Sequence, residues 1–266
     1  MKPIQAMTVL VLLLLAGCTG ERNAKHTEEP EAEEEPLPER FENDDLPKAA
    51  EELFDDFMYY FASNENLQRR RIVFPLPTDT GMVNEQQWQT DPFFMTAGEY
   101  TLIFDTAEER EVVNDTTINE VTIEKLFLNS DSICQYAFIR TDGRWRMTAI
   151  HQQQLSTMPN ASFLKFYQQF ATDSTFQEKS LMKEIAFSGP DPDDDFAQME
   201  GFITPDSWEA FAPELPKDTI YNIVYKKHNA CSKEKIFVIC GISNGQEMEL
   251  TFQQKSGKWK LAKLTE

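Results

Sequence analysis

Few side chains in this sequence have the type and spacing that acid–base catalysis needs. The three histidines lie in unrelated surroundings, where we expect exposed or structural roles: His26, His151 and His228. Carboxyl groups inside apolar strands would be better bases, but Glu99, Asp105 and Glu124 fall at predicted strand edges or on outer faces. Strings typical of phosphate-binding loops, serine hydrolases and zinc peptidases are absent. The sequence therefore predicts no catalytic residue and makes an enzyme the less favoured class.

An acidic run at residues 191–195 places carboxylates at positions 1, 3 and 5 of a possible calcium loop. An EF-hand is excluded because Phe196 stands where a turn-forming glycine is required and Phe202 where a bidentate glutamate is required. We interpret the run as a solvated acidic loop. The sequence thus predicts no metal site.

Beyond Cys18 the cysteines are odd in number, so no disulfide framework is indicated: Cys134, Cys231 and Cys240. Cys231 and Cys240 flank a strand-like run whose extended length of ~30 Å exceeds the span of a disulfide. Their spacing also lacks the paired pattern of zinc sites. We expect buried or free thiols and no cofactor.

Aromatic side chains are better candidates for a binding site, because flat ligands stack on them. Trp145 and Trp259 alternate in phase with apolar neighbours, so we expect them in the core. A possible ligand pocket is assigned instead to aromatic residues of other segments: Trp88, Tyr100, Trp208 and Tyr221. Core packing is the competing interpretation for these four residues.

The N-terminal segment has the pattern of an export leader. Lys2 precedes an apolar run at residues 7–16, which is too short to cross a membrane as a helix. The run ends in Leu15-Ala16-Gly17-Cys18, which resembles the lipobox of bacterial lipoproteins. This resemblance implies removal of residues 1–17 as a signal peptide and attachment of lipid, including palmitate, to Cys18. Acyl chains alone would then hold the protein on a membrane. An ordinary secretory leader is the alternative.

The next segment, residues 18–47, is rich in acid and proline and almost free of apolar side chains. It cannot bury enough surface to fold, so we expect a disordered acidic tether. The formal net charge of the whole chain is −20, and the only basic cluster is Arg69-Arg70-Arg71. Nucleic acid is therefore excluded as a partner. We expect the protein in the bacterial envelope, at the outer membrane, on either its periplasmic or its cell-surface face.

A correspondence between the two halves predicts an internal duplication. The matched landmarks are Phe54-x-x-Phe57-x-x-x-Phe61 with Phe163-x-x-Phe166-x-x-x-Phe170, Trp88 with Trp208, Tyr100 with Tyr221, and Gly143-Arg144-Trp145 with Gly257-Lys258-Trp259. Their order and approximate spacing are the same in both halves. Each copy is long enough to form its own core, so we predict two tandem domains, 48–152 and 160–266.

Each copy begins with a helix, since its phenylalanines recur at helical spacing; Asp45 or Asn160 would cap that helix. Alternating segments further on predict strands at 100–105, 120–128, 133–140 and 144–150, and at 220–226, 235–242, 246–254 and 258–264. Asp142-Gly143, Asn244-Gly245 and Ser256-Gly257 fit tight hairpin turns. The predicted class is α+β, with N-terminal helices packed on an antiparallel sheet.

The Phe-rich opening helix, a middle of short helices and the final hairpins with Trp145 and Trp259 resemble the nuclear-transport-factor-two-like fold, also called SnoaL-like or ketosteroid-isomerase-like. The whole chain resembles an uncharacterised family of lipoproteins from gut Gram-negative anaerobes. The resemblance implies two cone-like domains, each with a curved sheet and helices around a cavity. Some proteins of this fold use the cavity as an active site and others as a binding pocket, so the fold assigns no function.

We therefore expect a non-enzymatic, lipid-anchored envelope protein whose tandem domains bind a small molecule, a glycan or a protein partner. Two other classes stay open. One is a small-molecule enzyme, isomerase-like or hydrolase-like, that uses one cavity; the other is a structural or scaffold protein of the envelope. An open cavity with an unpaired, buried Asp or His would favour catalysis, whereas cavities filled by apolar side chains would exclude it.

Overall fold

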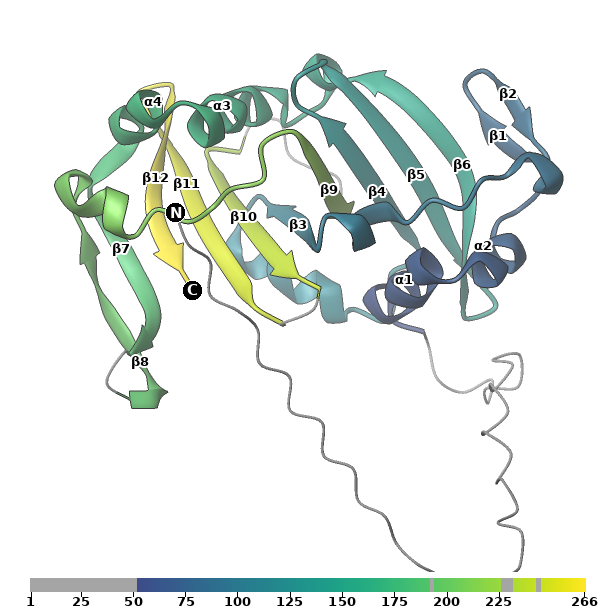
Figure 1. Cartoon of the computed structure of the whole chain (residues 1–266), viewed down its shortest axis with the longest axis horizontal. Coiled ribbons are helices and arrows are strands. Elements are labelled where there is room, and N and C mark those ends of the chain that lie inside the picture. Colours follow the sequence, from purple (N-terminus) through teal and green to yellow (C-terminus); the bar gives the residue numbers. More distant parts are fainter. Residues whose placement is uncertain (1–51, 192–193, 226–231, 243–244) are drawn as a thin grey trace, which may run out of the picture. The chain divides into compact units, whose positions relative to one another are not determined.

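A computed structural model shows the fold of residues 52–266, apart from 192–193, 226–231 and 243–244 (Figure 1). The described residues belong to one compact unit. Several predicted features lie outside them: the signal peptide, the tether with Cys18, and His26, Asp45, His228, Cys231 and Asn244. Among the described residues, no helix is long and apolar enough to cross a membrane.

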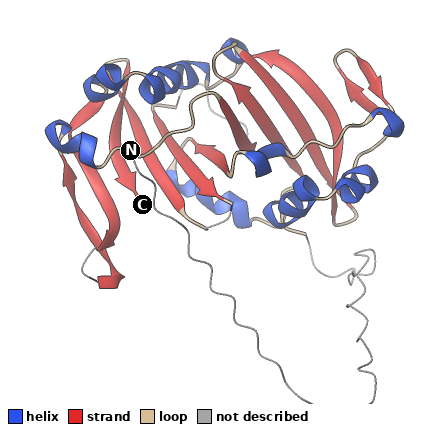
Figure 2. Cartoon of the chain, in the orientation of Figure 1, coloured by secondary structure: helices blue, strands red, loops and turns tan. Residues whose placement is uncertain are grey.

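The predicted α+β class is confirmed (Figure 2). The first half contains α1 (Phe54–Ser63), α2 (Glu65–Arg71), β1 (Leu76–Thr78), β2 (Gly81–Val83), η1 (Glu85–Gln87), η2 (Phe93–Thr96), β3 (Glu99–Phe104), η3 (Ala107–Asn114), β4 (Glu120–Phe127), β5 (Ser132–Thr141), β6 (Arg144–Gln154) and η4 (Leu155–Thr157). The second half contains α3 (Ala161–Thr172), α4 (Ser174–Lys179), β7 (Leu181–Asp191), β8 (Asp194–Ile203), η5 (Pro205–Ala210), β9 (Thr219–Val224), β10 (Glu234–Gly241), β11 (Glu247–Lys255) and β12 (Lys258–Thr265).

The first helix of each half buries the aromatic stripe that predicted it. All six phenylalanines of the two stripes lie in the hydrophobic core: Phe54, Phe57, Phe61, Phe163, Phe166 and Phe170. Trp145 and Trp259 are also buried, as predicted from their phase. The turns at Asp142-Gly143 and Ser256-Gly257 have positive φ at both residues, which is the conformation that tight hairpins require.

Asn160 differs from its predicted role. It occupies the N-cap position of α3, but its side chain makes no capping hydrogen bond. Both amide atoms are buried and have no partner among the described residues. The backbone of Asn160 has φ −97° and ψ 15°, away from the extended conformation from which a capping side chain reaches the first-turn amides. The capping prediction was therefore wrong for this residue.

All the named strands belong to one sheet, in the order β2-β1-β6-β5-β4-β9-β3-β10-β11-β12-β7-β8. The run β1-β6-β5-β4 from the first half and the run β7-β12-β11-β10 from the second have the same internal order. Between these runs two strands are exchanged. β9 of the second half pairs with β4, and β3 of the first half pairs with β10. β3 and β9 lie side by side and parallel (Figure 1).

This exchange differs from the expectation of two separate sheets. Independent tandem domains would use β3 to complete the first sheet and β9 to complete the second. In the structure each of these strands pairs with the edge strand of the other half's run, so the runs of 48–152 and 160–266 are joined into one continuous sheet. The positions of the predicted strands agree with β3 to β6 and β9 to β12. Strand partners depend on long-range pairing, which periodicity does not encode.

Two hydrophobic cores lie on opposite faces of the exchanged strands. In β3, Leu102 and Phe104 belong to the core that contains α1, whereas Ile103 belongs to the core that contains α3. In β9, Tyr221 and Ile223 face the first core. Successive strand residues point to opposite faces, so a strand between two cores must be apolar on both.

Polar groups are nevertheless buried where the halves meet. The Glu124 carboxylate on β4 accepts hydrogen bonds from Asn222 Nδ2 on β9 at 3.2 Å and from Gln135 Nε2 on β5 at 3.0 Å. Thr101 on β3 donates to Asn222 Oδ1 at 3.4 Å, which extends this network to a fourth strand. Burial raises the pKa of Glu124, because a charged carboxylate loses its hydration there.

The raised pKa predicts how Glu124→Gln changes stability. A folded-state pKa above the unfolded value means that Glu124 supports folding below pH ~4.3 and loses this contribution as pH rises through the folded pKa. Glutamine keeps the shape and one acceptor oxygen but not the charge, and its NH2 group is accommodated if one of the two neighbouring amides turns its own oxygen toward it. We expect Glu124→Gln to raise the free energy of unfolding at pH 7 by on the order of 1 kcal/mol, and to give no gain at pH 4.

Urea unfolding at both pH values measures this difference. Glu120→Gln is the matched control, because Glu120 begins the same strand but is exposed. A destabilised Glu124→Gln variant at pH 7 would show that the charged form is the one that the network stabilises.

Candidate functional site

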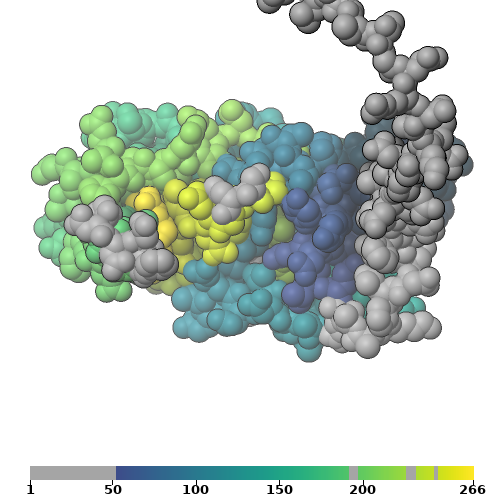
Figure 3. All heavy atoms as spheres, turned by 60° about the horizontal axis from the view of Figure 1, so that its bottom comes forward, coloured from purple at the N-terminus to yellow at the C-terminus, as the bar shows by residue number. Residues whose placement is uncertain are grey.

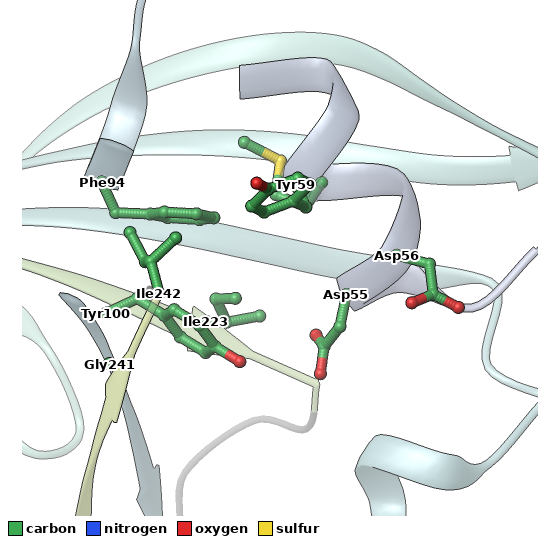
Figure 4. A pocket seen from close by; sticks show the side chains of 9 residues that line it. Asp55, Asp56, Tyr59, Phe94, Tyr100, Ile223, Gly241 and Ile242 are labelled. Atoms are coloured by element: carbon green, nitrogen blue, oxygen red, sulfur yellow. The ribbon is translucent and has the colours of Figure 1, made fainter. Parts of the chain in front are cut away.

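A cavity of about 240 Å³ lies between α1, η2 and the ends of the central strands (Figure 4). Its walls come from both halves of the chain: α1, η2 and β3 from the first, and β9 and β10 from the second. The lining residues are Asp55, Asp56, Met58, Tyr59, Phe94, Tyr100, Ile223, Gly241 and Ile242. A volume of this size equals that of on the order of eight liquid water molecules. It suits a ligand with one aromatic ring and short substituents.

Asp55 supplies the most distinctive polar group of the cavity. It lies in the first turn of α1, where its carboxylate Oδ1 accepts a hydrogen bond from the Tyr225 hydroxyl that follows β9. Burial raises the pKa of Asp55, and the neighbouring charges of Asp56 and Glu247 raise it further, whereas the Tyr225 hydrogen bond opposes this rise. The site thus holds a partly buried carboxyl group whose charged form is disfavoured by burial and by the nearby negative charges.

Tyr100 and Cys240 form a second polar pair beside Asp55. They are direct partners in the β3–β10 ladder, and their side chains hydrogen-bond one another. Burial raises the pKa of the Tyr100 hydroxyl well above its usual range and raises the pKa of the Cys240 thiol to about 12. Both groups are therefore neutral at physiological pH. Cys240 is a buried, protonated thiol and not an activated nucleophile.

The structure brings Tyr100 and Tyr221 together, as two of the predicted pocket residues. Phe94 lies between them, with its ring centroid 5.1 Å from that of Tyr100 and 6.5 Å from that of Tyr221. Only Tyr100 lines the cavity. Tyr221 is buried beside Lys125, whose ammonium lies 5.1 Å from its ring centroid.

Trp88 and Trp208 are placed in the two cores and not around this cavity. The Trp88 indole donates to Gln68 Oε1 at 3.1 Å, and the Trp208 indole donates to Gln177 Oε1 at 2.9 Å. Each glutamine follows the first helix of its half and also donates to that helix: Gln68 to Phe61 and Gln177 to Phe170. The two indoles thus hold α2 and α4, the short helices that contain these glutamines, against the cores.

A second polar cluster lies behind η2 in the first core. Tyr136 donates from its hydroxyl to Asp91 Oδ2 at 2.8 Å and also hydrogen-bonds Cys134. Burial raises the pKa of the Cys134 thiol, and a hydrogen bond with Tyr221 helps to raise the pKa of Lys125. These groups satisfy one another within the core.

Several residues of the cavity were not found from the sequence. Asp55, Met58 and Tyr59 belong to a helix recognised only by its phenylalanine stripe, and Phe94 lies in a short 3₁₀ helix. The one signal available was the adjacency of Asp55 to Phe54 at the start of the helix. His151 is half-exposed and lies 3.2 Å from the exposed Asp79 carboxylate, away from the cavity lining.

Cofactor and metal ligation have no evident place in the part of the chain that the structure describes. No group of three or more His, Cys, Asp or Glu side chains there could hold a metal ion. Residues 192–193 of the acidic run lie outside that part. The chemistry of the cavity is therefore that of carboxyl, hydroxyl and aromatic groups.

Comparison with solved structures defines the class of this protein. The fold is similar to the crystal structure of an NTF2-like protein from Bacteroides fragilis NCTC 9343, with a TM-score of 0.75 and 37% sequence identity over 83% of this chain and 98% of that chain. Residues 33–266 match the family described as a domain of unknown function (DUF4348), and the chain belongs to that family. No curated protein matches it. The expected membership of an uncharacterised NTF2-like family is thus confirmed.

The Asp55–Tyr225 contact predicts the effect of Tyr225→Phe. Without its hydroxyl donor the buried carboxylate loses a charge-assisted hydrogen bond, so the pKa of Asp55 rises further. We expect the free energy of unfolding at pH 7 to fall by roughly 1.5–3 kcal/mol. Carboxyl NMR titration and urea unfolding measure the two effects.

Tyr60→Phe is the control for this substitution, because Tyr60 lies on α1 but is 59% exposed. It should change neither quantity. An unshifted Asp55 pKa in Tyr225→Phe would contradict the assigned hydrogen bond.

Proposed function

We propose that this chain is a lipid-anchored protein of the bacterial cell envelope, at the outer membrane, that binds a small molecule in the cavity beside α1. The observation that carries the proposal is the cavity itself, in which apolar walls surround a few polar groups whose hydrogen bonds hold them in place. Such a composition is typical of small-molecule sites. Glycans and protein partners stay as alternative ligands.

The anchor rests on the sequence pattern that ends at Cys18. The acidic tether after it would hold the folded unit away from the bilayer. The similarity to a protein from the bacterium Bacteroides fragilis fits a bacterial origin. We also infer that the two halves arose by duplication, because their strand runs share one order and their helices share one aromatic stripe.

Catalysis is the second candidate function, and Asp55 is the observation that favours it. A carboxyl with a raised pKa beside a neutral tyrosine is a combination suited to proton transfer. Asp55 is, however, hydrogen-bonded to Tyr225, and no imidazole lines the cavity. Binding therefore accounts for the arrangement with fewer additional groups. A scaffold role is the third candidate, and it would need no ligand.

The anchor predicts incorporation of labelled palmitate into the wild-type chain during growth. Cys18→Ala should abolish the label, because the acceptor thiol is lost. Cys134→Ala is the control and should keep it, since Cys134 lies on β5 within the folded unit. Label in Cys18→Ala, detected by fluorography of the purified protein, would contradict the proposal.

The cavity predicts weak binding of a small neutral probe, benzyl alcohol, detected by saturation-transfer NMR. Ile242→Trp should reduce the signal at least tenfold, because the larger side chain occupies the cavity that Ile242 lines. Ile139→Trp is the control, since Ile139 is 40% exposed on β5. Equal signals from both variants would place the binding elsewhere. If benzyl alcohol and its charged analogues benzyltrimethylammonium and benzoate all fail to bind, a scaffold role is favoured.

A further inference from the structure

We infer that the ligand of this cavity is a small organic cation, an ammonium or quaternary ammonium group attached to an apolar body. The inference rests on the proposed binding function and deepens it. The cavity combines three aromatic rings, two carboxylates and no basic side chain among its lining residues. This set of groups favours a positive charge over a negative one.

The aromatic walls provide faces for a cation. Phe94 and Tyr100 are inclined by 38° to each other, and Figure 4 shows both rings beside the apolar side chain of Ile242. Tyr59 lies across from Phe94 on α1 and is 47% exposed, which places a third ring at the opening. The face of an aromatic ring attracts cations through its quadrupole, and cages of such rings bind quaternary ammonium groups.

The carboxylates provide the complementary charge. Figure 4 shows the Asp55 carboxyl beside the Tyr100 hydroxyl, at the base of the aromatic group. Asp55 Oδ1 accepts from Tyr225, and its other oxygen has no hydrogen-bond donor among the described residues. Asp56 lies on the exposed side of the same helix turn, at the opening. The Asp55 carboxylate would thus contact a bound cation, and the Asp56 carboxylate would attract the cation to the opening.

Among the described residues, the neighbours of Asp55 supply negative charge and little positive charge to compensate it. The groups that act on it are Tyr225, Asp56 and Glu247, with Tyr100 and Cys240 adjacent, and none of these carries positive charge. Arg110 is the nearby base, and it forms ion pairs with Glu247 and Glu249. A bound cation would supply positive charge that the described neighbours of Asp55 do not, so cation binding and ionisation of Asp55 favour each other.

The test uses probes of one shape and three charges: benzyltrimethylammonium, benzyl alcohol and benzoate. We expect the cation to bind the wild-type protein at least tenfold more tightly than benzyl alcohol, and benzoate to bind most weakly. The affinity of the cation should fall with added salt, whereas that of benzyl alcohol should not. It should also fall as the pH drops through the pKa of Asp55, since the probe itself does not titrate. Isothermal titration calorimetry measures the affinities of the three probes and their dependence on salt and pH.

Matched variants locate the effect. Asp55→Asn should reduce affinity for the cation at least tenfold and leave benzyl alcohol binding unchanged, whereas Asp56→Asn should have a smaller effect. Tyr59→Ala, at an exposed position, tests the aromatic wall without the risk of unfolding and should weaken the cation several-fold. Glu178→Gln removes one exposed charge from α4 and should change nothing.

The outcomes separate the two proposals. Benzyl alcohol that binds as tightly as the cation, and is lost in Ile242→Trp, would overturn the inferred charge and keep the cavity as a binding site. Failure of all three probes to bind would overturn the binding function as well.

Discussion

The exchange of β3 and β9 is the constraint on which the rest of the structure depends. Each strand completes the sheet of the other half, so β3, β9 and β10 contribute side chains to both cores. The cavity beside α1 exists only because of this arrangement. Its floor combines Tyr100 of β3 with Ile223 of β9 and Gly241 of β10, strands that two independent domains would keep apart. The cavity is therefore a feature of the joined sheet and not of either half alone.

Burying polar groups between the halves costs free energy. The positions of these groups indicate which strand pairing they favour. Lys235 on β10 pairs with Asp105 at the end of β3, and their side chains are only 2% and 5% exposed. Glu124 reaches Asn222 across the β4–β9 ladder. Buried ionic and polar pairs add little net stability compared with apolar packing. They do penalise alternatives: if β3 or β9 paired with its own half, these groups would lose their partners. We interpret both contacts as determinants of the exchanged pairing.

The parts of the fold that could be predicted are those encoded locally. The spacing of Phe54, Phe57 and Phe61 located α1, and alternation located the strands, because burial of one face imposes a period on the sequence. The exchange could not be predicted, since the sequence of a strand indicates that the strand is buried but not which strand it pairs with. Asp55 was missed for a related reason. An acidic residue in a first helical turn is ordinary, and only the distant Tyr225 and Glu247 make it unusual.

The sheet faces toward the two cores differ in polarity. Lys125 of β4 pairs with Cys134 and Tyr221, whereas Ile239 of β10 pairs with Met248 and Thr101. The first core therefore has an amino group and a thiol beside it at these positions, whereas the second core has the apolar side chains of Ile239 and Met248.

The end of β10 borders two cavities. Gly241 lines the cavity beside α1 and also a second cavity of about 500 Å³. The second cavity has an apolar floor and an acidic rim formed by Glu99, Glu214, Glu247 and Glu266. Burial raises the pKa of Glu99, and the neighbouring charge of Glu214 raises it further. Carboxylates on two adjoining concave surfaces reinforce one another, because low-dielectric walls focus their field. This end of the sheet therefore attracts cations from both sides, and the aromatic rings beside α1 determine where one would bind.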